Sequence, residues 1–161
     1  MLNLGAGSAT AAPNGKVVIN VDHVRHERGD DQPFVVADAL RLPFRRHSFA
    51  GAVLKDIIEH VDDPIGVLLE TGRVAPCIVV TTPRAIPRAV WNDPTHIRGF
   101  TRRALIEALT RAGFHVTSGP NRIGAVPMAG RLRLENYLEV VLRIPGFGHR
   151  FGTNWIVRAA R

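Results

Sequence analysis

Hydrophobic residues along this chain fall into short continuous runs, separated by polar stretches that are rich in glycine, proline and charged residues. Short apolar runs without polar alternation are typical of parallel strands that are covered on both faces. The pattern predicts strands over residues 2–4, 17–21, 34–38, 51–55, 77–82, 114–117 and 154–160.

Apolar residues at helical spacing lie between several of these runs. Asp63-Pro64 supplies an N-cap followed by a proline at the first helical position, so a helix is predicted to begin there. Thr101 is predicted to cap a helix over 102–112, and a further helix is predicted over 132–142. Residues 84–99 are polar and are predicted to form a long loop. This order of elements predicts a predominantly parallel, three-layer α/β fold.

The length and composition are those of an ordinary globular protein. The 161 residues are expected to form a single domain, residues 1–161, that buries roughly two-thirds of the surface of the unfolded chain. No run approaches the roughly 20 apolar residues of a membrane span, and the N-terminus lacks the pattern of a secretory signal. Cys77, a lone cysteine, excludes an internal disulfide, and a cytoplasmic location is expected.

The chain is basic, with 21 Lys and Arg against 14 Asp and Glu, and most of the bases are arginine. One interpretation is a surface that binds an anionic partner such as RNA, a phosphorylated metabolite or a lipid headgroup. The other is the background composition of the source proteome. The arginines are scattered singly or in pairs, such as Arg45-Arg46 and Arg102-Arg103, which favours the second interpretation.

The strongest chemical signal lies in the first two predicted strands. The strand over 2–4 runs into Gly5-Ala6-Gly7, and the strand over 17–21 ends on Asp22. Glycines let the backbone pass close to a ligand, and a carboxylate at the tip of the next strand can accept hydrogen bonds from both ribose hydroxyls. The spacing predicts a nucleoside site. A Gly-x-Gly turn by itself is also compatible with an NAD(P) dehydrogenase.

Four further segments extend this pattern in a fixed order: Asp38-Ala39-Leu40-Arg41-Leu42-Pro43-Phe44, Glu59-His60-Val61-Asp62-Asp63-Pro64, His96-Ile97-Arg98-Gly99-Phe100-Thr101 and Ala112-Gly113-Phe114. Together with the glycine turn, they resemble the class I methyltransferases that depend on S-adenosylmethionine (SAM), over about residues 2–116. The resemblance implies a Rossmann-like, mostly parallel sheet of the class I type, with an antiparallel last strand.

The resemblance also implies a role for each matched position. Gly5 and Gly7 would pass their backbone beside the methionine part of SAM, and Asp22 would hold the ribose hydroxyls. Asp38 would accept the adenine amino group. On the residues alone, Asp38 could instead cap a turn and Asp22 could be solvated, but the spacing of the pair favours the ligand role. The cofactor-binding residues implied in this way are Gly5, Ala6, Gly7, Asp22, Asp38, Ala39, Leu40 and Lys55.

The chain departs from the pattern of this family near its start. Ser8 or Ala9 stands where a third glycine is usual, and residues 6–15 leave little room for the first helix. The helices that precede the first strand in the family and help to cover the cofactor are missing. Three explanations remain open: a second copy or a partner subunit supplies the cover, the chain is a fragment, or binding has been lost. Residues 120–150 are a candidate acceptor-specific or oligomerisation insert.

The candidate catalytic residues are His96, in the polar loop after the fifth strand, and Asp56, at the end of the fourth. Asp56, Glu59 and His60 have the spacing with which some relatives hold a divalent metal, and a helix there would place Asp56 and Glu59 on one face. Metal-free relatives carry the Glu-His pair too, so a site without metal is the favoured expectation.

Two functions remain as hypotheses. The first is a SAM-dependent methyltransferase that acts on a hydroxyl of a small molecule, sugar or lipid. The second is a methyltransferase-fold protein without catalysis that binds nucleic acid or another anionic partner through its basic surface. Binding of SAM separates the two hypotheses.

Overall fold

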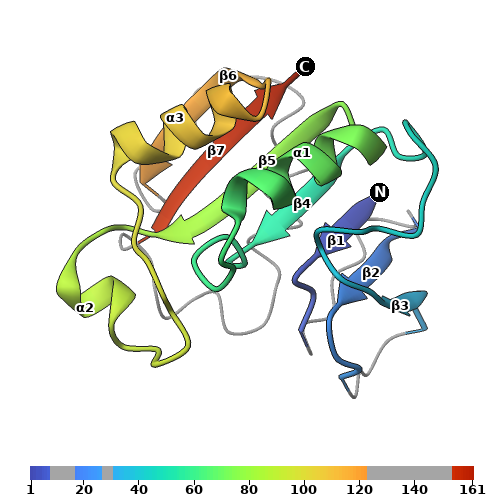
Figure 1. The fold of residues 1–161 in the computed structure, drawn as a ribbon, viewed down its shortest axis with the longest axis horizontal. Helices are drawn as coiled ribbons and strands as arrows, with labels where there is room; N and C mark the ends of the chain where they lie inside the picture. The colour runs from blue at the N-terminus through green and yellow to red at the C-terminus, as the bar shows by residue number, and fades with distance from the viewer. Residues whose placement is uncertain (8–16, 27–30, 123–153) are drawn as a thin grey trace.

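The computed structural model describes residues 1–7, 17–26, 31–122 and 154–161. Within these residues, seven strands form one sheet in the order β3-β2-β1-β4-β5-β7-β6 (Figure 1). The strands are β1 (Leu2–Leu4), β2 (Ile19–Asp22), β3 (Phe34–Val36), β4 (Ala52–Lys55), β5 (Cys77–Pro83), β6 (His115–Arg122) and β7 (Asn154–Ala160).

The first five strands are parallel to one another, as their continuous apolar runs predict. The last strand, β7, lies between β5 and β6 and is antiparallel to both. The mostly parallel α/β sheet with an antiparallel last strand is therefore confirmed. No helix in the described part of the chain is long and apolar enough to cross a membrane.

Two of the predicted helices form close to their predicted ends. Helix α1 (Pro64–Val74) begins after Asp63, whose side chain accepts a hydrogen bond from the Gly66 N–H at 2.8 Å. Helix α3 (Arg102–Arg111) begins after Thr101, whose hydroxyl accepts from the Ala104 N–H at 3.1 Å. The loop predicted over 84–99 contains a short helix, α2 (Pro87–Val90). The helix predicted over 132–142, and most of the candidate insert over 120–150, lie outside the described residues.

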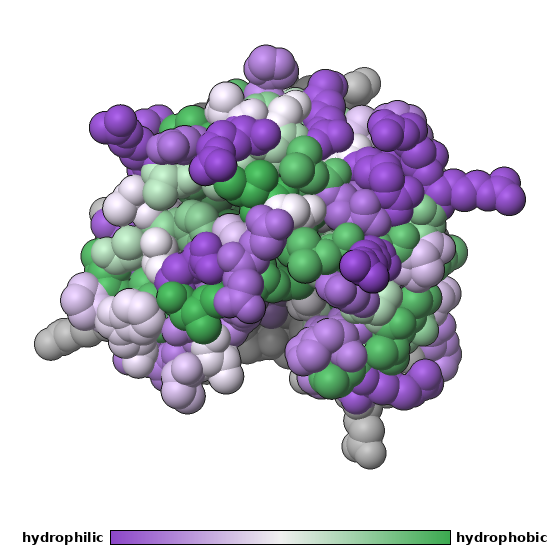
Figure 2. All heavy atoms as spheres, viewed as in Figure 1, coloured by the Kyte–Doolittle hydropathy of each residue, from purple (hydrophilic) through white to green (hydrophobic). Residues whose placement is uncertain are grey.

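Helices α1 and α3 lie side by side over one face of the sheet (Figure 1). The core between these helices and the sheet is built from buried aliphatic residues of the strands, such as Leu4 and Leu54, and from Leu68 of α1 and Leu109 of α3. On the outer surface of this face, hydrophilic side chains surround small hydrophobic patches (Figure 2). The layer predicted on the opposite face is not represented among the described helices.

The register of the parallel strands brings their carboxyl ends to one edge of the sheet. Leu4 lies opposite both Val21 and Leu54, so β1, β2 and β4 end at the same level. A buried polar pair spans β1 and β2, because the Asn3 amide donates to the Asn20 side-chain oxygen at 2.9 Å. At this edge of an open parallel sheet, the loops that follow the strands form the usual ligand site.

Candidate functional site

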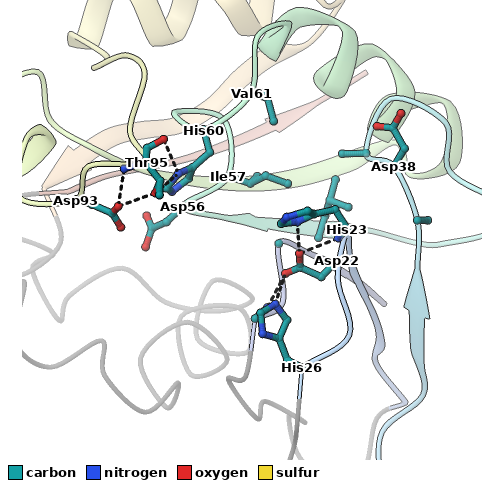
Figure 3. A pocket seen from close by; sticks show the side chains of 15 residues that line it. Asp22, His23, His26, Asp38, Asp56, Ile57, His60, Val61, Asp93 and Thr95 are labelled. Carbon is teal, nitrogen blue, oxygen red and sulfur yellow. Dashed lines mark hydrogen bonds and ion pairs between the residues drawn. The ribbon is translucent and has the colours of Figure 1, made fainter.

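A cavity of about 740 Å³ lies at the carboxyl ends of β1, β2 and β4 (Figure 3). Every strand from β1 to β4 contributes residues to it, either from its last residues or from the loop that follows, and the loop after β5 supplies two more. The lining residues are Leu4, Gly5, Gly7, Asp22, His23, His26, Ala37, Asp38, Ala39, Asp56, Ile57, His60, Val61, Asp93 and Thr95.

The glycine turn after β1 depends on backbone conformations that favour glycine. Gly5 has φ +72° and Gly7 has φ +55°. A Cβ on Gly5 would lie 3.0 Å from the Ile57 Cβ and 3.2 Å from the Lys55 carbonyl oxygen, whereas a Cβ on Gly7 would meet no described atom within 4 Å. Gly5 therefore lets two loops approach each other, while Gly7 leaves open space beside the cavity.

Asp22, at the end of β2, is tied to the glycine turn. Its carboxylate accepts hydrogen bonds from the Gly7 N–H at 2.8 Å and from the His23 N–H at 2.7 Å. Burial by itself raises the pKa of Asp22, but these bonds and the nearby His23 and His26 rings outweigh it, so the pKa lies below its ordinary value. The carboxylate is thus ionised at neutral pH and can accept hydrogen bonds.

Asp38 follows β3 and caps a turn, which is the alternative role that its sequence position allows. Its carboxylate accepts from the Leu40 N–H at 2.8 Å, and its carbonyl oxygen accepts from the Arg41 N–H at 3.0 Å. The side chain nevertheless borders the cavity, as does Ala39. Leu40 was also predicted to bind the cofactor. Its N–H already donates a hydrogen bond to Asp38, and its side chain is exposed.

Asp56, directly after β4, also lines the cavity and has the left-handed φ of +47°. Its N–H donates to the Thr81 carbonyl oxygen at 3.1 Å, and its carboxylate accepts from the Thr81 hydroxyl at 3.1 Å. The sequence-based placement of Asp56 and Glu59 on one helical face is wrong. The residues after β4 form a turn, closed by a bond from the His60 N–H to the Ile57 carbonyl oxygen, and α1 starts only at Pro64.

His60 begins a chain of hydrogen bonds along the wall of the cavity (Figure 3). Its Nδ1 lies 3.2 Å from the Thr95 carbonyl oxygen and 3.0 Å from the Thr95 hydroxyl, which in turn donates to the Asp93 carboxylate at 2.6 Å. A carbonyl oxygen only accepts, so we assign the proton of the neutral ring to Nδ1. Burial and the neighbouring His96 lower the pKa of His60 below its ordinary value.

Glu59 and His96 lie behind this wall. Glu59 is fully buried, and burial together with the negative charge of Asp56 raises its pKa to about 8, although the Thr82 hydroxyl acts in the opposite direction. The His96 ring packs against the His60 ring with centroids 4.5 Å apart, and its Nδ1 contacts the Val90 carbonyl oxygen. His96 Nε2 lies 3.9 Å from Glu59 Oε1, which is too far for a direct hydrogen bond.

The structure therefore brings together most of the residues that the sequence singles out. Gly5, Gly7, Asp22, Asp38, Ala39, Asp56 and His60 line the cavity, whereas Ala6, Leu40, Lys55, Glu59 and His96 do not. Ala6 is buried, and its N–H donates to the Val21 carbonyl oxygen at 3.1 Å. His23, His26, Asp93 and Thr95 line the cavity without having been predicted as site residues. His23 directly follows Asp22 and His26 comes four residues after it, and this proximity is the signal in the sequence that could have found them.

Comparison with known sequences gives one family. Residues 3–76 match the sequence model of a family described as a methyltransferase domain. A search of the curated proteins gives no significant match. The matched segment runs from β1 to the residue before β5 and includes the glycine turn, Asp22, Asp38 and Asp56.

Several solved structures with a similar fold are described as methyltransferases. A SAM-dependent methyltransferase from Archaeoglobus fulgidus has a TM-score of 0.63 at 19% identity, with 99% of this chain and 85% of that chain covered. A complex of the Haloferax volcanii Trm112 methyltransferase activator with a methyltransferase matches with a TM-score of 0.63 at 16% identity, over 99% and 80%. Burkholderia thailandensis 1,6-didemethyltoxoflavin-N1-methyltransferase, with its substrate and S-adenosylhomocysteine bound, matches with a TM-score of 0.59 at 18% identity, over 99% and 70%. These comparisons confirm the resemblance to class I SAM-dependent methyltransferases and their Rossmann-like fold.

Proposed function

We propose that this chain is a SAM-dependent methyltransferase that transfers a methyl group to a hydroxyl of a small molecule, sugar or lipid. The observation that carries the proposal is the composition of the cavity. Its β1–β3 side has the glycine turn with Asp22 and Asp38, and its β4–β5 side has Asp56 and His60 (Figure 3). The first group suits a nucleoside, and the second suits an acceptor whose proton must be removed.

The residues on the nucleoside side fit SAM. The open space at Gly7 lets the methionine part of the cofactor pass close to the backbone. The Asp22 carboxylate is ionised, and its side chain is 10% exposed, so it can accept from both ribose hydroxyls in a mostly dry setting. Asp38 and Ala39 would then border the adenine. When bound, SAM supplies a methyl group on a sulfonium, and the bound S-adenosylhomocysteine of the Burkholderia enzyme supports this assignment.

Methyl transfer is an in-line displacement, so the protein chiefly positions the acceptor and removes its proton. Asp56, His60 and Asp93 are the titratable groups on the β4–β5 wall. Asp93 Oδ1 already accepts hydrogen bonds from the Thr95 N–H and hydroxyl, so we assign the proton to Asp56 or His60. His96, the base expected from the sequence, has a side chain only 3% exposed and lies behind His60. We therefore assign His96 to positioning rather than to direct contact with the acceptor.

A partner that covers the cavity is part of the proposal. A second copy of the chain or another subunit would cover the side of the cavity on which SAM is proposed to bind. The Haloferax complex with a methyltransferase activator supports such an arrangement in a protein of the same fold.

Calorimetric titration with SAM and S-adenosylhomocysteine tests the proposal. Wild-type chain and the control Asp62→Ala, which changes an exposed carboxylate away from the cavity, should bind both ligands. Asp22→Ala should bind at least about tenfold more weakly, because a hydrogen bond to a charged group contributes roughly 1.5–3 kcal/mol and about 1.4 kcal/mol is tenfold. Thermal melting of each variant shows whether it is folded.

Two results would overturn the assignment. One is unchanged affinity in Asp22→Ala. The other is no binding of either ligand by wild-type chain at high protein concentration, which would favour the non-catalytic alternative. Salt-sensitive retention on an RNA column, in the absence of SAM binding, would then identify the basic surface as the working part.

A further inference from the structure

Three potential metal ligands converge behind the acceptor side of the cavity. Glu59 and His60 come from the turn after β4, and His96 comes from the loop between α2 and α3. One donor atom from each residue lies within 4.8 Å of the others. The loops are held together by a hydrogen bond from the Ile97 N–H to the Glu59 carbonyl oxygen at 3.0 Å, so the convergence is fixed by the backbone.

The environment of Glu59 distinguishes this cluster from an ordinary polar contact. The residue is 0% exposed, yet neither carboxylate oxygen has a hydrogen-bond partner of ordinary geometry among the described residues. Buried polar groups are nearly always satisfied, because an unpaired one loses its hydration without compensation. The buried Glu59 side chain, which lies next to two imidazoles, is therefore available as a ligand for a bound ion.

The two histidines are oriented as metal ligands usually are. The His96 Nδ1 contacts the Val90 carbonyl oxygen and the His60 Nδ1 contacts the Thr95 carbonyl oxygen, so each Nδ1 carries the proton of its neutral ring. That leaves Nε2 of both rings with a lone pair. A metal-bound histidine typically donates its other ring N–H to a carbonyl or carboxylate in the same way.

We propose that Glu59, His60 and His96 bind a divalent transition-metal ion of the zinc type. Two imidazole nitrogens and one carboxylate oxygen form a set that such ions prefer, whereas magnesium and calcium favour oxygen ligands alone. The surroundings are also suited to a cation: Asp93 Oδ2 lies 4.0 Å from His96 Nε2, and the charge of Asp56 acts on Glu59. Three protein ligands leave a coordination position open, and His60 borders the cavity on that side.

The role of this ion rests on the proposed function. A divalent ion beside the cavity lowers the pKa of an acceptor hydroxyl that reaches it. With His60 engaged by the ion and Asp93 Oδ1 bonded to Thr95, we assign the proton to the Asp56 carboxylate. The acceptor O–H bond breaks, the proton passes to the Asp56 carboxylate, and the new O–C bond forms as the S–C bond of the sulfonium breaks.

Metal binding can be tested without a methylation assay. Chelator-treated chain is titrated with Zn²⁺ and, separately, with Mg²⁺ by calorimetry, and Co²⁺ is added as a spectroscopic probe of nitrogen ligation. Wild-type chain and His115→Gln, which changes an exposed histidine of β6, should bind one Zn²⁺ far more tightly than Mg²⁺. Glu59→Gln and His96→Gln should each lose at least about tenfold in Zn²⁺ affinity, since even a change behind a metal ligand costs 10–100-fold.

Thermal melting gives a second readout, in which the effect of added Zn²⁺ separates Glu59→Gln from wild type. Without metal, this variant should melt close to wild type, because Gln has nearly the same size and shape as Glu and is buried in the same way. With Zn²⁺, wild type should gain stability and the variant should not. Equal Zn²⁺ affinity in all four proteins, or no Zn²⁺ binding by wild type, would overturn the metal site. SAM titration of the chelated chain reports separately on the proposed function, because the nucleoside side includes none of the three ligands.

Discussion

Replacing Gly5 and Gly7 separately with alanine probes the turn on which the nucleoside side of the cavity depends. Both residues have a positive φ, +72° and +55°. They differ in their surroundings, because a Cβ at Gly5 would lie 3.0 Å from the Ile57 Cβ and one at Gly7 would meet no described atom within 4 Å. The two substitutions thus share the backbone strain but not the steric conflict.

The expected magnitudes follow from this difference. A left-handed conformation costs an L-residue about 1–2 kcal/mol, and the loss of glycine entropy in the unfolded chain offsets about 0.4–1 kcal/mol of it. Gly7→Ala should therefore lower the free energy of unfolding by about 1 kcal/mol. Gly5→Ala adds an overpacking cost of about 1–3 kcal/mol against Ile57 and the Lys55 carbonyl oxygen. Its total of roughly 2–4 kcal/mol is a large part of the stability of a typical domain.

Urea unfolding measures the free energy of unfolding of each variant, and calorimetric titration measures its affinity for SAM. Gly5→Ala should show the larger stability loss, whereas Gly7→Ala should remain folded and bind SAM more weakly, because its methyl group occupies space beside the cavity. Equal stability losses in the two variants would refute the close approach of the Gly5 and Ile57 loops. Unchanged SAM affinity in Gly7→Ala would refute the passage of the ligand beside this turn.

Three further predictions concern the frame and the electrostatics of the site. Asp63→Ala should lower the free energy of unfolding in urea by about 1 kcal/mol through loss of the α1 N-cap, whereas Asp62→Ala should have little effect. Because the pKa of Asp22 is lowered on folding, its ionised form stabilises the chain above pH 3.8; the stability difference between wild type and Asp22→Asn should shrink as the pH falls below that value. In chelated protein, Asp93→Asn should lower the pKa of His60 further in an NMR titration, since the negative charge of Asp93 raises it, and Asp62→Asn should leave it unchanged.

The sheet was predictable because each of its parallel strands is read from a local apolar run. The caps of α1 and α3 were equally local, since Asp63 and Thr101 act on N–H groups three residues away. Helix α2 was missed because four residues that begin at a proline within a polar stretch carry no periodicity. The turn after β4 was mistaken for a helix because the spacing of Asp56 and Glu59 is helical. The positive φ of Asp56, which prevents the helix, could not be read from the sequence as it can be at a glycine.

The nucleoside side of the site was predictable for the same reason that the strands were. Parallel strands end at one edge, so a carboxylate placed just after a strand reaches the site without further information, as Asp22 and Asp38 do. The β4–β5 side depends instead on where a loop of sixteen residues, 84–99, folds back. Which of His60 and His96 borders the cavity is decided by the bond that ties Ile97 to Glu59, and no spacing in the sequence encodes that contact.

The burial of Glu59 connects the fold to the chemistry of the site. A turn whose only task was to join β4 to α1 would be more stable with an apolar residue in place of an unpaired, fully buried carboxylate. The same turn carries Asp56 and His60 into the cavity, and Glu59 lies between them in sequence and behind them in space. The proposed cation would offset the cost of ionising Glu59 in this buried position and would fix the His60 ring at the wall of the cavity. On this reasoning, the least stable choice of residue in the turn is the one that the acceptor side of the site requires.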